Sequence, residues 1–497
     1  MITRWLRGLI PTGTVTERAA KSGVWAAIIN VADRVLQLGM VIVLGNLLDP
    51  ADFGLYGIAL LSLGLMRRVS ELGLDDSLIQ RTERNVDAYL NTLWTMKVLQ
   101  GIAIVAIAYF AAPSVAAIFD EPRAAVVLRA VALSPLLIGI RNPRVMYLDK
   151  NLEFHKKFVY QFSGTLVQVG VAIGLALLSG TVWALVFGLL LGDVVRTISS
   201  YAIDPYVPVP AFDRGRAREM FGYGKWLTGS GLVSFLFSEG DDAFVGWFLG
   251  APALGFYQMA YRLARAPSTE VTQVISSVML PTYSEIQDDL VALRNAYFSV
   301  LKLTVLVSAP MALGIVAVAP TFVRAFLGTE WTVAIVPMQI LAAWGLLLSI
   351  GSSSGPLFKA RGRPDYITKV MILKTVLLAA LIYPATARFG VAGTAGAVVC
   401  SALFTSEPII NYLAIKEIGG SFRQFFVIVG MPLVASVIMW GGVTALRSHL
   451  VRSADPVSFV LLVAAGGAIY VVCVLALNRL IGYGALDLLR TVRQAVS

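Results

Sequence analysis

The chain has 497 residues, of which 57% are hydrophobic and 14% are charged, and its mean hydropathy is +0.76. A soluble domain carries roughly 25% charged residues, so this composition excludes a soluble protein and indicates an integral membrane protein. The formal net charge of +10 does not favour nucleic-acid binding, because a cationic excess in a multi-pass protein is first explained by positively charged cytoplasmic loops.

Apolar segments long enough to cross a bilayer recur along the whole chain. They predict an all-α membrane protein with about fourteen transmembrane helices, near residues 22–47, 54–79, 89–112, 124–148, 158–179, 181–203, 225–250, 256–280, 297–320, 333–357, 367–388, 391–414, 425–446 and 457–479. Lysine and arginine are concentrated in the connections on the side of the N-terminus. The positive-inside rule therefore places both termini in the cytoplasm of a protein of the cell (inner) membrane.

The first predicted helix, 22–47, carries two adjacent charged residues, Asp33 and Arg34, inside its apolar run. A charge at the centre of a membrane helix costs about 2.5 to 3.5 kcal/mol on insertion scales, so it is usually met by water, a partner or a ligand. Asn30, Arg34 and Gln37 recur at i, i+4 and i+7 and share one face, which we expect to line a polar cavity. Asp33 lies about 100° away around the helix, and it either holds another helix or tunes Arg34.

Further cations lie in or at the edges of later helices: Arg67, Arg68, Lys97, Arg262, Arg265 and Lys302. Arg67 could pair with Glu71 one turn along its helix, and Lys97 could extend to the membrane surface, so structural roles stay open for both. Lipid-facing helices do not tolerate so much charge, which implies a large aqueous space inside the protein.

The longest connection, residues 204–223, contains three prolines and a basic cluster. It is predicted as a cytoplasmic linker, either a solvated loop or an amphipathic segment on anionic lipid. The predicted organisation is a cytoplasmic N-terminus (1–21), helices one to six (22–203), the linker (204–223), helices seven to twelve (224–414), and helices thirteen and fourteen with a cytoplasmic C-terminus (415–497).

The sequence after the linker repeats the sequence after the N-terminus at a constant offset of 201 residues, as from Trp25 to Trp226. The other matched pairs are Gly23 and Gly224, Gly45 and Gly246, Leu48 and Leu249, Gly54 and Gly255, Tyr56 and Tyr257, and Ala59 and Ala260. Six predicted helices separate equivalent points, so both copies cross the membrane in the same direction. Parallel repeats of this kind form one established transporter architecture, with the substrate site between the halves.

Helix seven brings three carboxylates close together, Glu239, Asp241 and Asp242. In a low-dielectric setting they cannot easily all be ionised, so at least one is expected to exchange a proton or bind sodium. Ion pairing with Arg262 and Arg265, which share a face of helix eight, is an equal alternative.

Several segments resemble one known family. "LGNLLDPADFGLYGIA" and "LGAPALGFYQMAYRLA" place G-x-Y, preceded by Phe or Leu, at the start of helices two and eight. "SLIQR" follows helix two, "LPTYSEIQDD" follows helix eight, "FLGTEWTVA" precedes helix ten and "KARGRPD" follows helix ten. As a set they resemble the oligosaccharide flippases of the polysaccharide transport family, the lipopolysaccharide exporter type, within the multidrug, oligosaccharidyl-lipid and polysaccharide exporter superfamily. The resemblance implies two pseudo-symmetric six-helix lobes around a V-shaped cavity, two extra C-terminal helices, and alternating access that moves a polyprenyl-linked saccharide to the outer leaflet.

The predicted substrate is therefore a glycan linked to polyprenyl phosphate or pyrophosphate, with membrane lipids and glycan-assembly enzymes as further candidate partners. Guanidinium groups bind phosphate oxygens in a bidentate manner. The predicted headgroup site comprises Arg34, Arg67, Arg68, Lys97, Arg262, Arg265 and Lys302, with Asn30, Asp33 and Gln37 lining the cavity. Glu239, Asp241 and Asp242 are the candidates for ion coupling.

Three other functions stay open from the sequence, one of which is a lipid scramblase or scaffold with no specific glycan. A multidrug and toxic-compound extruder of the same superfamily would favour carboxylates and aromatic residues for organic cations. A membrane glycosyltransferase or polymerase would need a sizeable outer loop with catalytic residues, and the outer connections are short. No Walker-type motif is present, and no catalytic residue, metal or cofactor is predicted.

Overall fold

The computed structural model describes residues 15–70, 87–151, 153–265, 279–449 and 454–481. Every regular element in these ranges is a helix, which confirms the predicted all-α class. Nine helical stretches in the described residues are long and apolar enough to cross a membrane. The chain is thus a multi-pass membrane protein, while the total of fourteen helices stays a prediction.

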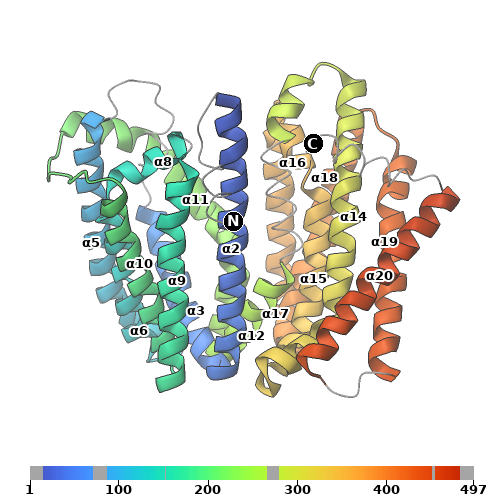
Figure 1. Ribbon diagram of the computed structural model, residues 1–497, viewed down its shortest axis with the longest axis horizontal. Coiled ribbons are helices and arrows are strands. Elements are labelled where there is room, and N and C mark those ends of the chain that lie inside the picture. The colour runs from blue at the N-terminus through green and yellow to red at the C-terminus, as the bar shows by residue number, and fades with distance from the viewer. Residues whose placement is uncertain (1–14, 71–86, 152, 266–278, 450–453, 482–497) are drawn as a thin grey trace, which may run out of the picture. The chain divides into compact units, whose positions relative to one another are not determined.

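The chain divides into two compact units, Met1–Gly255 (unit 1) and Phe256–Ser497 (unit 2). Unit 1 contains α2 (Val15–Leu47), α3 (Pro50–Ser70), α5 (Asp87–Ile118), α6 (Ala124–Val131), α7 (Leu133–Gly139), a 3-10 turn (Pro143–Val145), α8 (Met146–Lys150), α9 (Phe154–Ser179), α10 (Trp183–Ile203), α11 (Arg214–Leu249) and the first turn of α12 (Ala251–Ala264). Helix α9 packs along α10 on one side and along α2 on the other (Figure 1).

Local sequence signals explain several helix ends in unit 1. Helix α3 begins with Pro50, whose missing N–H costs nothing in a first turn, and Asp52 adds a negative charge near the positive end of the helix dipole. Helix α9 ends at Gly180, which adopts a left-handed conformation with φ 58°.

The fourth predicted helix, 124–148, is divided in the structure into α6, α7, the 3-10 turn and α8. Pro135 has no backbone N–H to donate to the carbonyl of Val131, and α6 therefore ends at Val131. Asn142 then caps the 3-10 turn by accepting a hydrogen bond from the backbone N–H of Arg144 at 2.9 Å. Hydropathy alone does not reveal the break between α6 and α7, because both helices are apolar.

The first half of the predicted linker, residues 204–213, contains no helix and lies along α5. The Tyr206 hydroxyl and the Val209 backbone N–H donate to Oδ1 of Asn91 at 2.7 and 3.0 Å. The backbone N–H of Ala211 donates to Thr95 at 3.1 Å. Side chains of α5 therefore satisfy backbone groups of the linker, and α11 begins directly after it at Arg214.

Unit 2 contains the rest of α12, α14 (Leu290–Phe322), a π-helical turn (Val323–Leu327), a 3-10 helix (Thr329–Ala334), α15 (Ile335–Gly351), α16 (Ser354–Ala360), α17 (Pro364–Ser401), a second π-helical turn (Ala402–Ser406), α18 (Glu407–Glu417), α19 (Phe422–His449) and α20 (Pro456–Ile481). Asp289 caps α14 by accepting from the N–H groups of Val291 and Ala292, both at 2.9 Å.

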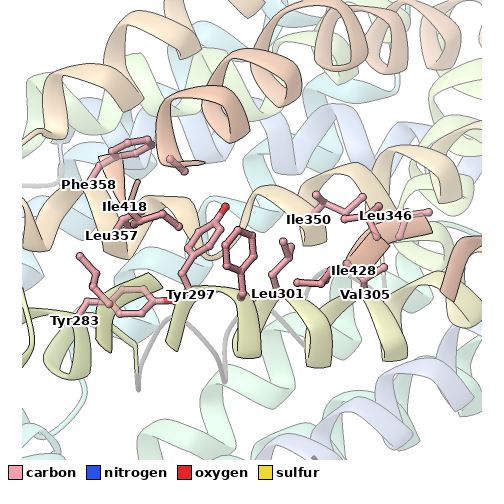
Figure 2. Close-up of a cluster of buried hydrophobic side chains, with 14 of the residues drawn as sticks. Tyr283, Tyr297, Leu301, Val305, Leu346, Ile350, Leu357, Phe358, Ile418 and Ile428 are labelled. Atoms are coloured by element: carbon pink, nitrogen blue, oxygen red, sulfur yellow. The ribbon is translucent and has the colours of Figure 1, made fainter. Parts of the chain in front are cut away.

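The core of unit 2 forms where α14 packs against α15 and α19. Tyr297 and Leu301 of α14 are fully buried there beside Phe358 of α16, and Leu346 and Ile350 of α15 extend the same cluster (Figure 2). This apolar packing fixes the helices around the buried polar groups described below.

Helix α17 reverses direction at Gly390, between the predicted helices 367–388 and 391–414. Gly390 has φ 57° and ψ −139°, and the hydroxyls of Thr386 and Thr394 on either side approach to 2.8 Å. Only glycine adopts such backbone angles readily.

Gly390→Ala is expected to lower the free energy of unfolding by about 1 to 3 kcal/mol, the usual cost of a strained backbone conformation. Thermal unfolding of the purified protein in detergent measures the effect. Gly396→Ala is the matched control in the same element, because Gly396 has helical angles and open space around its Cα. Equal unfolding temperatures for the two variants would contradict the prediction.

Candidate functional site

The interior of unit 1 contains a network of charged side chains centred on Asp193 of α10. Arg141 Nη2 and Arg196 Nη1 both donate to Oδ1 of Asp193, at 2.7 and 3.3 Å. The hydroxyl of Ser134 donates to the other carboxylate oxygen at 2.6 Å. Asp193 is only 4% exposed, so these three donors replace the water that a buried carboxylate loses.

Two hydroxyl groups extend this network to α3 and α2. Ser134 accepts a hydrogen bond from Arg67 Nη2 at 2.9 Å while it donates to Asp193. Thr165 of α9 accepts from Arg196 Nη2 at 2.9 Å and donates to Oδ1 of Asp33 at 2.6 Å. Each hydroxyl thus uses its single proton and one lone pair, and side chains from α2, α3, α7, α9 and α10 are joined in one network.

Asp33 binds a second helix, which is one of the two roles expected for it. Its Oδ1 accepts from Thr165 on α9, and its Oδ2 accepts from Gln37 Nε2 at 2.7 Å. Gln37 is therefore joined to the network through Asp33. The network contains three guanidinium groups, of Arg67, Arg141 and Arg196, against two carboxyl groups, and it carries a positive excess when all are ionised.

The predicted polar face of α2 is partly exposed within the described residues. Asn30 and Gln37 are exposed, and Arg34 between them is half-buried. Its role as a cavity lining stays a prediction.

The other predicted cations of unit 1 lie on α3 and α5. Arg68 is exposed, and its side chain lies next to Gly231 of α11. Lys97 on α5 is half-buried. Arg67 points instead to Ser134, and Glu71, its predicted helical partner, lies outside the described residues.

The remaining predicted residues are distributed over α11, α12 and α14. Asp241 and Asp242 are buried in α11, 7% and 4% exposed, whereas Glu239 is half-buried. In unit 2, Arg262 and Arg265 are exposed on α12 and Lys302 is half-buried on α14. The roles of all six in coupling or headgroup binding stay predictions.

Besides Asp52 at the start of α3, two buried carboxyl groups of the described residues are absent from the candidates predicted from the sequence, Asp193 in unit 1 and Glu407 in unit 2. Both are isolated acids in apolar helices, and Asp193 stands three residues before Arg196 on the same helix. The i, i+3 spacing with an arginine was the available signal for Asp193.

Apolar helices of membrane-spanning length, with guanidinium and carboxyl groups joined in their interior, define a multi-pass membrane transporter. The model of the family described as "Polysaccharide biosynthesis protein" matches residues 43–336, more than half of the chain. The chain belongs to this family.

Similar proteins agree with this assignment. The lipopolysaccharide biosynthesis protein WzxC of Escherichia coli (strain K12) is 27% identical over 436 residues, covering 85% of this chain and 86% of WzxC. The succinoglycan biosynthesis transport protein ExoT of Rhizobium meliloti (strain 1021) is 23% identical over 486 residues, covering 96% of this chain and 97% of ExoT.

A solved structure of the lipid II flippase MurJ, in an inward closed conformation, superposes with a TM-score of 0.75 at 15% identity, covering 91% of this chain and 98% of MurJ. The chain therefore has the MurJ fold. The family match confirms the predicted resemblance to proteins of polysaccharide biosynthesis, and the superposition confirms the predicted all-helical membrane fold.

Proposed function

We propose that the chain is a flippase, which moves an oligosaccharide linked to polyprenyl phosphate or pyrophosphate from the cytoplasmic to the outer leaflet by alternating access. The observation that carries this proposal is the positively charged network inside unit 1, together with membership of a polysaccharide biosynthesis family. WzxC and ExoT are named for lipopolysaccharide biosynthesis and for succinoglycan biosynthesis transport, and these polysaccharides contain glycans of this kind.

The chemistry of such a substrate explains the buried cations. A phosphate and a polar glycan cannot cross hydrocarbon without a polar environment that replaces their water. Arginine provides planar pairs of N–H donors for phosphate oxygens and stays charged at any physiological pH. The polyprenyl tail is apolar, so it can stay in the lipid throughout transport.

Arg34 is the proposed contact for the phosphate of the headgroup. It lies half-buried on α2 between the exposed residues Asn30 and Gln37, while its neighbour Asp33 accepts from Thr165 and Gln37. This arrangement anchors α2 to α9 through Asp33, and a guanidinium at this position is suited to bind a phosphate. Arg68 and Lys97 in unit 1, and Arg262, Arg265 and Lys302 in unit 2, are further candidates for headgroup contacts.

An ion gradient is the proposed source of energy, with Glu239, Asp241 and Asp242 as coupling residues. Two of these three carboxyl groups are buried in α11, and burial of neighbouring carboxyl groups favours binding of a proton or sodium ion. The proposed location is the cytoplasmic membrane, with both termini in the cytoplasm.

Arg34→Ala is expected to weaken binding of a polyprenyl-phosphate-linked oligosaccharide at least tenfold, because a hydrogen bond to a charged group contributes about 1.5 to 3 kcal/mol. Binding to the purified, detergent-solubilised protein measures the effect. Arg129→Ala is the control, since the Arg129 guanidinium lies over the ring of Tyr109 at 4.5 Å and belongs to no proposed site.

The same assay distinguishes the flippase from a drug extruder and tests coupling. Asp242→Asn should change the dependence of binding on pH or sodium while leaving the affinity for the glycan lipid measurable. If the glycan lipid does not bind wild type, and organic cations bind in a manner that requires Asp242, the flippase proposal is wrong.

A further inference from the structure

Glu407 is a buried carboxyl group in unit 2 whose hydrogen-bonding capacity is unused. It begins α18 and is only 9% exposed. Its Oε1 receives one long hydrogen bond, from Ser406 Oγ at 3.5 Å, and its buried Oε2 has no hydrogen-bond partner among the described residues. An ionised carboxylate needs several donors when it is removed from water, and only the side chains of Ser406 and Asn411 lie near enough to provide one.

The charged and titratable neighbours of Glu407 come from two other helices. Lys374 of α17 attracts the carboxyl group electrostatically, and its ammonium lies over the ring of Trp344 at 5.5 Å. No basic nitrogen of the described residues comes within the 4.0 Å of an ion pair with Glu407. Tyr297 of α14, whose hydroxyl pairs with Ser354 at 3.1 Å, is the other titratable neighbour (Figure 2).

The space around Glu407 does not favour a metal cation. A Cβ added at Gly351 of α15 would lie 2.6 Å from Oε2, so the backbone of α15 closes that side. The ammonium of Lys374 repels cations, and no cluster of three metal-ligating side chains occurs in the described residues. A hard cation would need several oxygen ligands, whereas a proton needs only one donor and one acceptor.

An acceptor for such a proton is available one turn along α18. Asn411 is 6% exposed and donates its amide N–H to the carbonyl of Glu407 at 2.8 Å, while its side-chain oxygen is buried without a partner in the described part of the chain. The side chain of Asn411 lies within hydrogen-bonding reach of the Glu407 carboxyl, so a proton on that carboxyl would have an acceptor in the unpartnered oxygen of Asn411.

We infer that Glu407 is a proton-binding site, at which the protonated carboxyl donates to the side-chain oxygen of Asn411. When α17 and α18 change their packing, the proton can leave and the resulting carboxylate can pair with Lys374. Burial favours the neutral acid in the arrangement described here, and an ion pair would stabilise the deprotonated form. This consequence for coupling rests on the proposed function, whereas the proton site itself does not.

Difference infrared spectroscopy on the purified protein tests the site without any substrate. At neutral pH, wild type is expected to show the C=O stretch of a protonated carboxyl that Glu407→Gln removes. Glu417→Gln is the matched control at the other end of α18, where Arg361 Nε donates to Oε1 of Glu417 at 3.0 Å. Asn411→Leu should shift the frequency of the band, because the proton loses its acceptor.

A neutral-pH spectrum that Glu407→Gln leaves unchanged overturns the proton site. If Glu407→Gln does not fold, a band that Asn411→Leu leaves unshifted overturns it equally, and a shifted band supports it.

Flipping of a polyprenyl-phosphate-linked oligosaccharide in vesicles with an imposed pH gradient tests the coupling. The pH gradient should change the flipping rate of wild type and of Glu417→Gln, and the change should be at least tenfold smaller for Glu407→Gln. An equal response of Glu407→Gln and wild type overturns the coupling role. If wild type flips no glycan lipid while the infrared band is assigned to Glu407, the proposed function fails and the proton site stands.

Discussion

Alanine at Gly54 or at Gly255 is expected to reduce transport at least tenfold, because neither position has room for a methyl group. A Cβ at Gly54 would lie 1.6 Å from the carbonyl oxygen of Ala251, and a Cβ at Gly255 would lie 2.1 Å from that of Pro50. The obstructing atoms are backbone atoms, which cannot rotate away as a side chain can. The first turns of α3 and α12 would therefore have to separate.

This contact has the symmetry of the sequence repeat. The offset of 201 residues that relates Gly54 to Gly255 also relates Pro50 to Ala251, so each first turn inserts its glycine against the carbonyl of the other. Such a reciprocal contact is the intramolecular counterpart of an isologous interface. Small residues four apart allow membrane helices to approach this closely. Alternating access requires contacts that form and separate, and this one can form only with glycine at both positions.

Flipping of the glycan lipid in vesicles, together with cross-linking of a Pro50→Cys, Ala251→Cys pair, measures the effect. The glycine variants should lower both the flipping rate and the yield of the cross-link. Gly39→Ala and Gly240→Ala are the controls, because nothing lies within 4 Å of a Cβ at either position. Wild-type flipping by Gly54→Ala would show that this approach is not needed for transport.

The repeat and the helical class could be read from the sequence because both depend on local or regularly spaced features. Apolar runs predicted 158–179 and 181–203, and the structure has α9 at Phe154–Ser179 and α10 at Trp183–Ile203. The match of Gly54 with Gly255 likewise needed only a constant offset. What these residues contact depended on how helices pack, which hydropathy does not encode.

The buried network shows the same limit at single residues. The sequence indicated that Asp33 needed a partner, but Thr165 lies 132 positions away and is unremarkable as a threonine. Asp193 could be suspected from its spacing to Arg196, whereas its bonds to Arg141 and Ser134 arise only from the packing of α7 and the following turn against α10. Glu407 gave no signal beyond being an acid in an apolar segment. The hydrogen-bond partners on other helices are therefore the part of the site that could not be predicted from the sequence.

Asp193→Asn is expected to lower the free energy of unfolding by about 3 to 5 kcal/mol, the cost of removing one member of a buried ion pair. The Asp193 side chain is 5% exposed and those of Arg141 and Arg196 are each 18% exposed, so water cannot replace the lost charge. Thermal unfolding in detergent measures the loss. Asp365→Asn is the control, because Asp365 pairs with Lys369 at 2.8 Å on an exposed surface and should change little.

A second substitution separates the charge of Asp193 from its shape. Adding Arg141→Gln to Asp193→Asn removes one of the two guanidinium groups left without a counter-charge, so the double variant should be more stable than Asp193→Asn alone.

The network also connects α3 to α2, because Asp193 joins Arg67 to Asp33 through the side chains of Ser134, Arg196 and Thr165. If the network positions the headgroup site, the Asp193→Asn protein that is still folded should bind the glycan lipid less tightly. If folded Asp193→Asn binds the glycan lipid as tightly as wild type, the network only stabilises unit 1. If Asp193→Asn is as stable as wild type, the charge of Asp193 is not needed to balance the guanidinium groups.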